Sequence, residues 1–422
     1  MNKNISSRRE FIKNLSLWAG TSAVISSLPW IKMLHAQESG SSSNANNINI
    51  GIIGTGSRGA LHMRYLNMIP NVTISAICDI YDPNLQEGLA RTNGKAETFK
   101  DYRQLLELKD LDAVVIATPL FEHASMTIDA LHAGKQVFCE KAMAKTIDDC
   151  YDMYKAKVET GNMLVIGHQR MFDPKYLQAY ELVKSGEIGN ITGIRGYWHR
   201  NSNWRRPVPQ PHLEKHINWR LYREFSCGLM TELGSHHFQV ANWFLEQHPL
   251  SVMGSGSVNY WRDGREVNDN VQVIFKYPDN THMVWDSLTS NKFYGMQVQL
   301  MGPKGTIESE TGKIYSENPP PASGILQLIN NIENQIFDAV PIGGASWVPE
   351  TANKNEGKYI LEKKLNTDGT DIMLEAFVNA VRNGSDFPEV TRQGLLASVA
   401  TLMGYSAILN QEIVYWPKKI IV

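Results

Sequence analysis

Three residues whose side chains can bind or transfer a proton lie in two short stretches of the sequence. Lys141 ends an apolar run typical of a strand, while Glu232 and His236 lie four residues apart in a helical stretch, 228–245. Residues four apart share one helix face. An ammonium group can orient a hydroxyl, and an imidazole can take up its proton near neutral pH. Together the three predict acid–base chemistry at a hydroxyl group.

Other interpretations of these residues stay open. A lysine at the end of a strand is often simply solvated, and a Glu–His pair on one helix face is often structural. The same pair is also a metal possibility, but the sequence shows no third ligand at metal spacing. We therefore expect no metal ion.

A glycine-rich segment between an apolar run and a helical stretch predicts a dinucleotide phosphate site. It consists of Gly54, Thr55, Gly56, Ser57, Arg58 and Gly59. Gly54 permits a tight turn, Gly56 lets the backbone approach a pyrophosphate, and Gly59 lets the helix pack on the strand. The helix N-terminus then faces the phosphate charge. The alternative is an ordinary strand–turn–helix.

An acidic residue follows at the spacing that a dinucleotide site requires. Asp79 lies 20 residues beyond Gly59, at the end of the second apolar run. Its carboxylate would accept hydrogen bonds from ribose hydroxyls and repel a 2′-phosphate. Asp79 therefore favours NAD over NADP, although Arg58 in the loop is able to help bind a phosphate.

Two further stretches end apolar runs and so belong to the same edge of the predicted sheet. They are Thr118-Pro119, with His123 in the next helix's first turn, and Glu140-Lys141. Ligand loops of open α/β sheets lie at the carboxyl ends of the strands. We expect all five residues to contact the cofactor. For His123, an equal alternative is that it is simply a capping residue at a turn.

A segment rich in tryptophan and arginine, 198–222, predicts a substrate surface. Aromatic faces stack on sugar C–H surfaces, and arginine donates to hydroxyls or carboxylates. The predicted contacts are Trp204, Arg205, Trp219 and Arg220, with His199 and Arg170 as further candidates. Alternatively, the aromatic residues pack the loop against a sheet.

The elements that must position these residues fall into two groups, which predict an α/β fold. Strands over 49–53, 72–78, 112–118, 136–141 and 163–167 alternate with helical stretches. This alternation predicts βαβ units on a parallel sheet, and hence a Rossmann dinucleotide-binding domain over 48–167.

The chain changes character after residue 168. A helix over 174–185, a strand over 191–197 and the long helix 228–245 precede two hairpins, with turns at 278–280 and 302–304. Helices over 371–382 and 394–409 close the chain, and the stretch 318–360 has weak periodicity and receives no assignment. The pattern predicts an α+β substrate domain over 168–422, with a large, mostly antiparallel sheet.

Length and composition fit a two-domain globular protein. The chain has 422 residues, 42% hydrophobic and 20% charged, with a net charge of −2. A nucleic-acid surface would need a basic face, so we expect no nucleic-acid partner. The four cysteines lack zinc spacing. Cys78 and Cys139, which end apolar runs, are expected to be small buried hydrophobic residues, with a disulfide left open.

The first 36 residues are typical of an export signal. A basic start (SRREFIK, 7–13) precedes a moderately apolar stretch, 15–31, and a small residue at 36 offers a cleavage point. The arginine pair matches a twin-arginine signal, and 37–47 form a polar linker. We expect a periplasmic or otherwise exported protein without a permanent membrane span. A membrane anchor or a fortuitous basic start is the alternative.

From about residue 48 to 410 the chain resembles the glucose-fructose oxidoreductase/inositol dehydrogenase (Gfo/Idh/MocA) family. The resemblance rests on the glycine-rich loop, Thr118-Pro119, Glu140-Lys141 and Glu232-Leu-Gly-Ser-His236. It implies that Lys141, Glu232 and His236 surround the reacting hydroxyl, with His236 as the acid/base.

Three departures from the family pattern bear on the site. Ala142 replaces the proline of the family's Glu-Lys-Pro motif, which makes the position of the lysine less certain. Glu232 replaces an aspartate, and Gln239 replaces the aspartate that commonly follows the histidine. The substrate pocket is therefore expected to differ from that of a standard inositol dehydrogenase.

The sequence thus predicts an NAD(P)-dependent oxidoreductase that moves a hydride between a nicotinamide and a hydroxyl carbon of a sugar or glycoside. Because free NAD is scarce outside the cytoplasm, we expect the cofactor to be tightly bound. The resemblance also implies a homo-oligomer. Two other functions stay open: a redox-neutral NAD-dependent glycosidase, and a non-catalytic sugar-binding or partner subunit.

Overall fold

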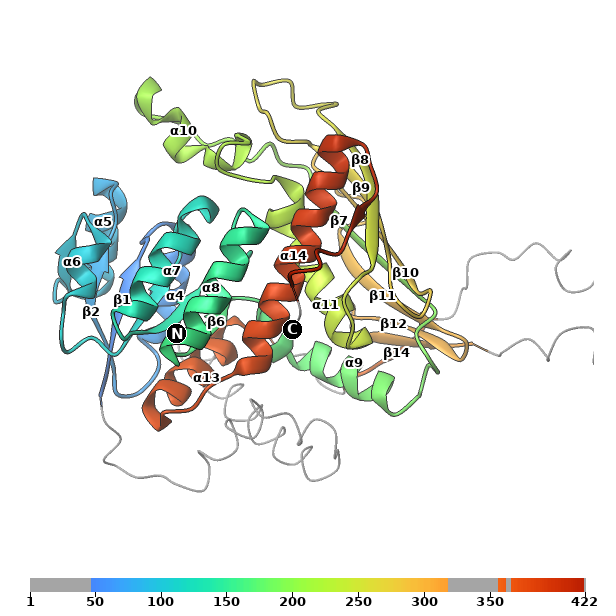
Figure 1. The fold of residues 1–422 in the computed structure, drawn as a ribbon, viewed down its shortest axis with the longest axis horizontal. Coiled ribbons are helices and arrows are strands. Elements are labelled where there is room, and N and C mark those ends of the chain that lie inside the picture. The colour runs from blue at the N-terminus through green and yellow to red at the C-terminus, as the bar shows by residue number, and fades with distance from the viewer. Residues whose placement is uncertain (1–46, 318–355, 362–365, 421–422) are drawn as a thin grey trace, which may run out of the picture.

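The computed structural model describes residues 47–317, 356–361 and 366–420 (Figure 1). The predicted signal peptide (1–36), nearly all of the linker and most of 318–360 lie outside these residues. No helix within the described ranges has the length and apolar character needed to span a bilayer. All four cysteines lie within them, buried and unpaired.

The first sheet has six parallel strands in the order β3-β2-β1-β4-β5-β6. The strands are β1 (Ile48–Ile53), β2 (Val72–Cys78), β3 (Glu97–Phe99), β4 (Ala113–Ile116), β5 (Gln136–Cys139) and β6 (Leu164–Ile166). This is the strand order of a Rossmann fold, and the predicted class is confirmed. The order reverses between β1 and β4, so the loops that follow these two strands bound a crevice.

Helices connect the strands of this sheet. They are α4 (Ser57–Leu66), α5 (Asp82–Arg91), α6 (Tyr102–Leu106), α7 (His123–His132) and α8 (Ile147–Thr160). The sequence analysis did not identify α5 or β3. In α5 only Leu85 and Gly88 are buried, so the helix carries little apolar periodicity.

The second sheet has nine strands in the order β14-β13-β12-β11-β7-β10-β9-β8-β15, and only the β7–β10 pair is parallel. The strands are β7 (Gly193–His199), β8 (Ser251–Ser257), β9 (Asn270–Lys276), β10 (His282–Leu288), β11 (Met296–Gly302), β12 (Gly305–Glu308), β13 (Lys313–Ser316), β14 (Lys358–Tyr359) and β15 (Val414–Tyr415). The predicted mostly antiparallel sheet is confirmed. Strand β8 was not predicted, because Gly254 and Gly256 interrupt its apolar alternation.

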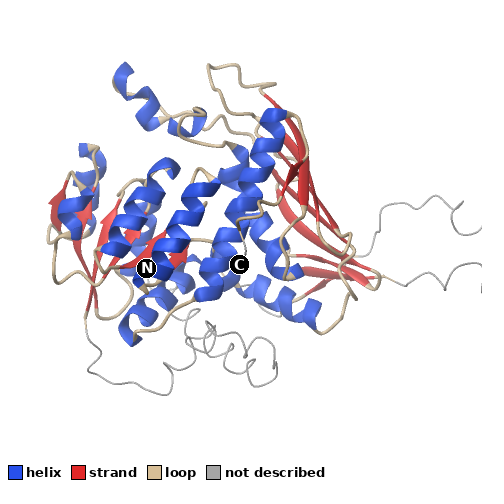
Figure 2. Ribbon diagram, in the orientation of Figure 1, coloured by secondary structure: helices blue, strands red, loops and turns tan. Residues whose placement is uncertain are grey.

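Helices fill the space between the two sheets (Figure 2). Helix α14 (Pro388–Asn410) packs against α8 and β6 on one side and against α11 (Ser235–Leu245) and β8 on the other. A Cβ at Gly394 would lie 2.6 Å from Ile166 Cβ, so the glycine permits this close approach. Helix α13 (Thr370–Asn383) packs against α4 and β1. Helix α9 (Pro174–Lys184) comes after the last strand of the first sheet along the chain.

The predicted helix 228–245 consists of two different helices. Its first turn, η5 (Met230–Gly234), is a π-helix, and α11 follows it. Gly234 packs tightly there, since a Cβ would lie 2.7 Å from the Phe238 ring. Single π-turns within helices are frequent at functional sites, and this one changes how Glu232 and His236 face each other.

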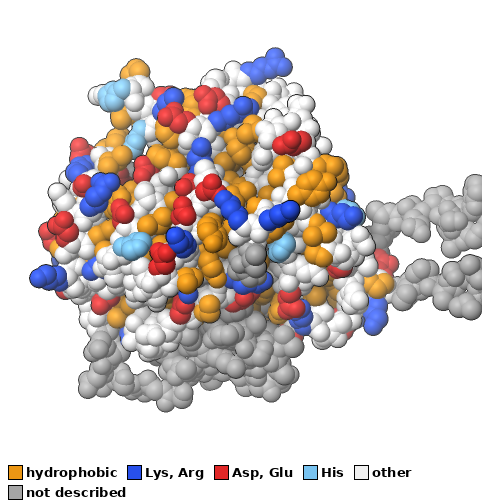
Figure 3. All heavy atoms as spheres, viewed as in Figure 1, with side chains coloured by type: hydrophobic (Ala, Val, Ile, Leu, Met, Phe, Trp, Pro, Cys, Tyr) orange, Lys and Arg blue, Asp and Glu red, His pale blue; other side chains and the backbone are white. Residues whose placement is uncertain are grey.

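The chain between β7 and η5 reaches back to the first sheet. It contains η3 (Pro211–Leu213), α10 (Glu214–Ile217) and η4 (Trp219–Leu221). We refer to residues 206–225 as the strap. Figure 1 shows α10 beyond the ends of the first sheet's strands. On the face of the molecule in Figure 3, acidic and basic side chains are intermixed.

Candidate active site

The turn after β1 has the backbone geometry that the glycine spacing predicts. Gly54 has a φ of +89°, and its N–H donates to the Cys78 carbonyl at 2.8 Å. A Cβ at Gly59 would lie 2.0 Å from the Gly54 carbonyl oxygen, so the helix packs directly on the turn. Helix α4 begins at Ser57, and its N-cap residue, Gly56, provides no side-chain cap; the first turn contains no acidic residue. Its first N–H groups are thus available to an anion.

Asp79 lies at the end of β2 and organises this turn. One carboxylate oxygen accepts hydrogen bonds from Thr55 N (2.9 Å), Thr55 Oγ1 (3.2 Å) and Asn84 Nδ2 (3.3 Å). The other accepts from Tyr81 N at 2.9 Å. Thr55 is buried and holds the carboxylate in place. Asp79 therefore occupies the predicted position, and it also fixes the loop itself.

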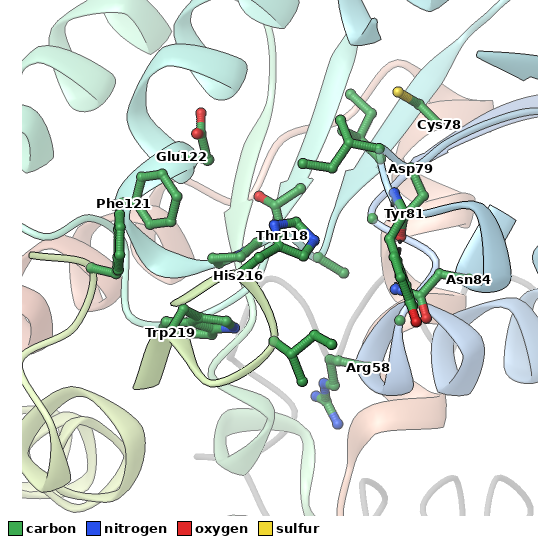
Figure 4. A pocket seen from close by; sticks show the side chains of 18 of the residues that line it. Arg58, Cys78, Asp79, Tyr81, Asn84, Thr118, Phe121, Glu122, His216 and Trp219 are labelled. Carbon is green, nitrogen blue, oxygen red and sulfur yellow. Dashed lines mark hydrogen bonds between the residues drawn. The ribbon is translucent and has the colours of Figure 1, made fainter. Parts of the chain in front are cut away.

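A cleft of about 960 Å³ runs along the carboxyl edge of the first sheet. Gly54, Gly56, Ser57, Arg58, Asp79, Thr118 and Pro119 line one wall. The strap forms the other, and Figure 4 shows its His216 and Trp219 facing the side of Asp79 and Tyr81. The rings of Tyr81 and His216 are 6.1 Å apart. The strap thus covers the cleft with side chains from the second half of the chain.

A second cavity of about 510 Å³ adjoins the cleft and contains the predicted acid–base residues. Lys141, Glu232 and His236 all line it, and Thr118, Trp219 and Arg220 are common to both spaces. The structure therefore brings Lys141 to the π-helical turn from a strand end roughly 90 residues earlier, and places both beside the dinucleotide cleft.

Lys141 points at the π-helical turn. Its Nζ donates to the carbonyl oxygens of Thr231 (3.2 Å) and Glu232 (2.8 Å). Burial lowers the pKa of Lys141 below its ordinary value. The Lys141–Ala142 peptide bond is cis. Lys141 lines the cavity, with Ala142 where the family has proline.

His236 is a neutral imidazole at the cavity wall. It is 7% exposed, and its Nδ1 has no hydrogen-bond partner among the described residues. Burial, with the nearby charges of Arg170 and Lys141, holds the pKa of His236 well below its usual value. The His168 ring lies edge-on to it, with centroids 6.0 Å apart. A neutral imidazole can accept a proton from a hydroxyl.

Glu232 pairs with an arginine instead of the histidine. One of its carboxylate oxygens accepts from Arg220 Nε at 2.7 Å. Although burial alone would raise the pKa of Glu232, Arg220 and Lys141 lower it, so the group is a carboxylate. Among the described residues no hydrogen bond joins Glu232 to His236. Both side chains nevertheless line the smaller cavity.

Glu140 is engaged within the protein. It accepts from Arg58 Nε at 2.6 Å, lies 2.7 Å from His62 Nε2, and accepts from Lys141 N at 3.2 Å. Burial alone would raise its pKa, but Arg58 and His62 hold the pKa of Glu140 far below its usual value. Glu140 lines the smaller cavity. Its hydrogen bond from Arg58 shows that it holds the Arg58 side chain in place.

His123 joins the two loops at this edge. Its ring nitrogens lie 2.9 Å from the Ala142 carbonyl oxygen and 3.1 Å from that of Thr118. Burial lowers its pKa, whereas Cys139 and these two carbonyls outweigh burial and raise the pKa of His123 to about 9. His123 thus fixes the Thr118-Pro119 turn against the segment that carries Lys141.

Of the six predicted substrate contacts, three line the smaller cavity: Trp204, Trp219 and Arg220. The other three do not line this cavity, and each is paired with a carboxylate. Arg170 is 5% exposed and bonds Glu310 Oε1 at 2.6 Å. His199 pairs with Asp286, and Arg205 pairs with Glu214 and Asp263. These pairs stabilise the second sheet and the strap.

Several cavity residues were not among the predicted contacts. Gln169, Trp198, Arg200, Leu233 and Arg206 all line the smaller cavity. Arg200 and Arg206 belong to the tryptophan- and arginine-rich stretch 198–222, for which a substrate surface was predicted. In an irregular segment, however, no periodicity indicates which side chain faces inward.

Family models cover most of the described chain. Residues 48–168 match the oxidoreductase family, NAD-binding Rossmann fold, and residues 176–308 match the GFO/IDH/MocA C-terminal domain. The chain belongs to the GFO/IDH/MocA family of oxidoreductases. Its first domain is an NAD-binding Rossmann domain.

Curated relatives within the GFO/IDH/MocA family include polyol dehydrogenases. Inositol 2-dehydrogenase of Salmonella typhimurium is 36% identical over 268 residues, covering 62% of this chain and 73% of that protein. The scyllo-inositol 2-dehydrogenase (NAD(+)) of Bacillus subtilis is 27% identical over 344 residues, covering 80% and 87%.

Solved GFO/IDH/MocA-like structures share the fold. Levoglucosan dehydrogenase in complex with NADH and levoglucosan superposes with a TM-score of 0.69 at 17% identity, over 88% of this chain and all of that one. WlbA dehydrogenase of Bordetella pertussis, in complex with NADH and UDP-GlcNAcA, gives a TM-score of 0.67 at 19% identity, over 88% of this chain and 98% of that one.

Within the described residues no group of three His, Cys, Asp or Glu side chains is arranged to hold a metal ion.

Proposed function

We propose that this protein catalyses reversible hydride transfer between NAD and a hydroxyl-bearing carbon of a sugar or glycoside. The observation that carries the proposal is the joint lining of one cavity by Lys141, Glu232 and His236, beside the NAD cleft. A neutral base, a cationic hydrogen-bond donor and a carboxylate then surround any hydroxyl that enters.

The glycine-rich turn fits the cofactor. The start of α4 carries no side-chain cap, and the nearest atom to a Cβ at Gly56 would be Asn84 Nδ2 at 3.5 Å. Backbone N–H groups are thus accessible from the cleft to a pyrophosphate, and Asp79 lies where a ribose would be held. When bound, NAD supplies the hydride acceptor or donor at nicotinamide C4.

The protein's own residues manage the proton. His236 accepts it from the substrate hydroxyl during oxidation and returns it during reduction. The Lys141 ammonium donates a hydrogen bond to the same oxygen and stabilises the negative charge that develops there. Glu232 holds Arg220 at the cavity and is available to a neighbouring hydroxyl. His236 is buried, and Lys141 and Glu232 are partly buried, which limits the access of water to the reacting atoms.

The lining favours a carbohydrate. Trp204 and Trp219 offer aromatic faces for stacking, and Arg220 offers donors for hydroxyl groups. The named relatives act on polyols and the structural neighbours bind sugars, which supports the same substrate class here.

One experiment tests this proposal. The purified protein is incubated with NAD⁺ and a panel of polyols, sugars and glycosides, with NADH absorbance and products followed together. A keto-sugar formed in step with NADH supports the proposal. Free sugar without net NADH would replace it with redox-neutral hydrolysis. No turnover of any panel member by a protein that binds NADH would indicate a non-catalytic subunit.

We also propose that the protein is exported by the twin-arginine route and holds its cofactor tightly. The support is the SRREFIK motif and the apolar stretch behind it, together with the strap over the cleft. The route is tested by fractionation of cells that express either the unaltered full chain or a variant carrying both Arg8→Lys and Arg9→Lys. The variant should stay in the cytoplasm, because the signal depends on the arginine pair; equal export of both chains would argue against the route.

We further propose a homo-oligomer, as the family resemblance implies. Met253, Ile274 and Val284, on neighbouring strands of the second sheet, are exposed apolar side chains. Light scattering on the purified protein gives the oligomeric state.

A further inference from the structure

One arginine of the strap reaches the phosphate end of the cleft. Arg206 Nη2 lies 3.4 Å from Ser57 Oγ, at the first residue of α4. Arg206 also lines both the 960 Å³ cleft and the 510 Å³ cavity. A cation from the second half of the chain thus stands beside the helix N-terminus at which the Rossmann domain receives phosphate.

This arginine differs from its neighbours in having no carboxylate partner among the described residues. Arg58 is paired with Glu140, Arg220 with Glu232, and Arg205 with Glu214 and Asp263. Arg200 also lacks a carboxylate partner but lines only the smaller cavity. Arg206 is therefore the arginine whose charge is available in the cleft itself, whereas the charge of Arg58 is already balanced.

The backbone of Arg206 is held in place by a buried side chain. Arg206 N donates to Asn218 Oδ1 at 2.7 Å, and Asn218 Nδ2 donates to the Arg206 carbonyl at 3.0 Å. Asn218 is 2% exposed and also bonds Glu214. Pro207 restricts the same residue further. The arginine is thus presented to the cleft from a fixed backbone, which reduces the entropy lost when it binds a ligand.

We propose that Arg206 binds the pyrophosphate of the dinucleotide from the strap side, opposite the N–H groups of α4. The inference rests on the proposed function in so far as the chain uses NAD. Two phosphate charges would then lie between a helix N-terminus of the first domain and a guanidinium of the second. Guanidinium–phosphate pairs are strong because they form parallel, charge-assisted hydrogen bonds. The cofactor cannot leave this arrangement without displacement of the strap, so release is slow.

The test measures binding of ligands that do or do not contain the pyrophosphate. The full-length protein and its Arg206→Ala, Arg206→Lys and Arg262→Ala variants are titrated with NADH, ADP-ribose and adenosine. Arg262 is an exposed arginine outside both spaces, so it controls for loss of one charge. Unfolding midpoints are recorded for each variant, and the dissociation rate of NADH is measured by displacement.

For Arg206→Ala we expect the Kd for both NADH and ADP-ribose to rise about 10- to 100-fold, with faster NADH release, because a hydrogen-bonded charge is removed. The Kd for adenosine should stay unchanged, Arg206→Lys should be intermediate because lysine lacks the two-pronged geometry, and Arg262→Ala should resemble the unaltered protein.

Unchanged ADP-ribose binding by a folded Arg206→Ala variant would overturn the inference. If the substrate KM rose at the same time, Arg206 would belong to the substrate cavity instead. If the unaltered protein bound neither NADH nor ADP-ribose, the proposed function would fail together with this inference.

Discussion

The two halves of the active-site cleft are built in different ways. At the glycine-rich turn the polar groups bond one another, and Asp79 alone accepts four hydrogen bonds from the chain. Among the residues that line the smaller cavity, His236 Nδ1 and Gln169 Oε1 are buried without a partner among the described residues. Buried polar atoms are normally satisfied. In the cofactor half the side chains therefore position one another before binding, whereas the catalytic half keeps buried polar atoms without partners among the described residues.

The two halves also differ in which segments of the chain supply their residues. The cofactor half depends mainly on one strand–turn–helix and the strand after it, residues 48–79. The catalytic half joins the end of β5, the segment after β6, the strap and the π-helical turn. Substitutions in the two halves should thus have separable effects, on dinucleotide binding in one and on turnover in the other.

The largest expected effect is on turnover. His236→Ala and Lys141→Met should each lower kcat about 10²- to 10⁴-fold, the range typical of a lost general acid or base, while the Kd for NADH stays within a few-fold. Steady-state kinetics and NADH titration measure both quantities. His282→Ala, an exposed histidine of β10, is the control. If NADH binding fell as far as kcat, the two halves would not be separable.

The next effect is on stability. Arg170→Met should reduce the free energy of unfolding by about 3 kcal/mol, because the mostly buried carboxylate of Glu310 loses its arginine and keeps only the Tyr176 hydroxyl and Lys175 nearby. Although burial alone would raise it, Arg170 and Tyr176 hold the pKa of Glu310 at about 2, so this group stays charged.

Denaturant unfolding checks this prediction, with Arg195→Met on the exposed face of β7 as the matched control. A loss below about 1 kcal/mol, the level of an exposed ion pair, combined with a raised substrate KM, would return Arg170 to the substrate site.

A smaller effect is expected at the cofactor half. Asp79→Ala removes the acceptor of Thr55 N and any acceptor for the ribose, so the Kd for NADH should rise about 10- to 100-fold. Binding of NADPH should fall less, because a 2′-phosphate no longer meets the carboxylate charge. Parallel titration with NADH and NADPH gives the ratio. Tighter binding of NADPH than NADH by the unaltered protein would contradict the predicted preference for NAD.

The sequence predicted the cofactor half better because its residues are close together in the chain. Gly54, Gly59 and Asp79 have spacings that only a strand–turn–helix satisfies, and all three lie where they were predicted. The long helix, in contrast, contains a π-turn that no apolar periodicity records, and the pairing of Glu232 with Arg220 was not predicted.

The start of the strap shows the same limit of prediction from sequence. Arg206, the first residue of the strap, directly follows Arg205 in the sequence, yet Arg205 pairs with Glu214 and Asp263 while Arg206 lines the cleft. Only tertiary packing of an irregular segment separates the two directions. A stretch rich in tryptophan and arginine could thus indicate a binding surface without identifying which residues belong to it.

The pH dependence of oxidation tests the electrostatics of the catalytic half. Oxidation needs neutral His236 and protonated Lys141. Because burial, Arg170 and Lys141 lower the pKa of His236 well below 6.5, the neutral base persists as pH falls, and the acidic limb of kcat/KM should lie below pH 6.5. Burial lowers the pKa of Lys141, so activity should decline on the alkaline side before pH 10.5.

Two variants assign these limbs. Lys141→Arg keeps its charge at high pH, so the residual activity of this variant should lose the alkaline limb. Arg170→Met removes a positive charge near His236, which raises the pKa of the imidazole and moves the acidic limb to higher pH. An acidic limb that stays fixed in Arg170→Met would mean that a group other than His236 accepts the proton.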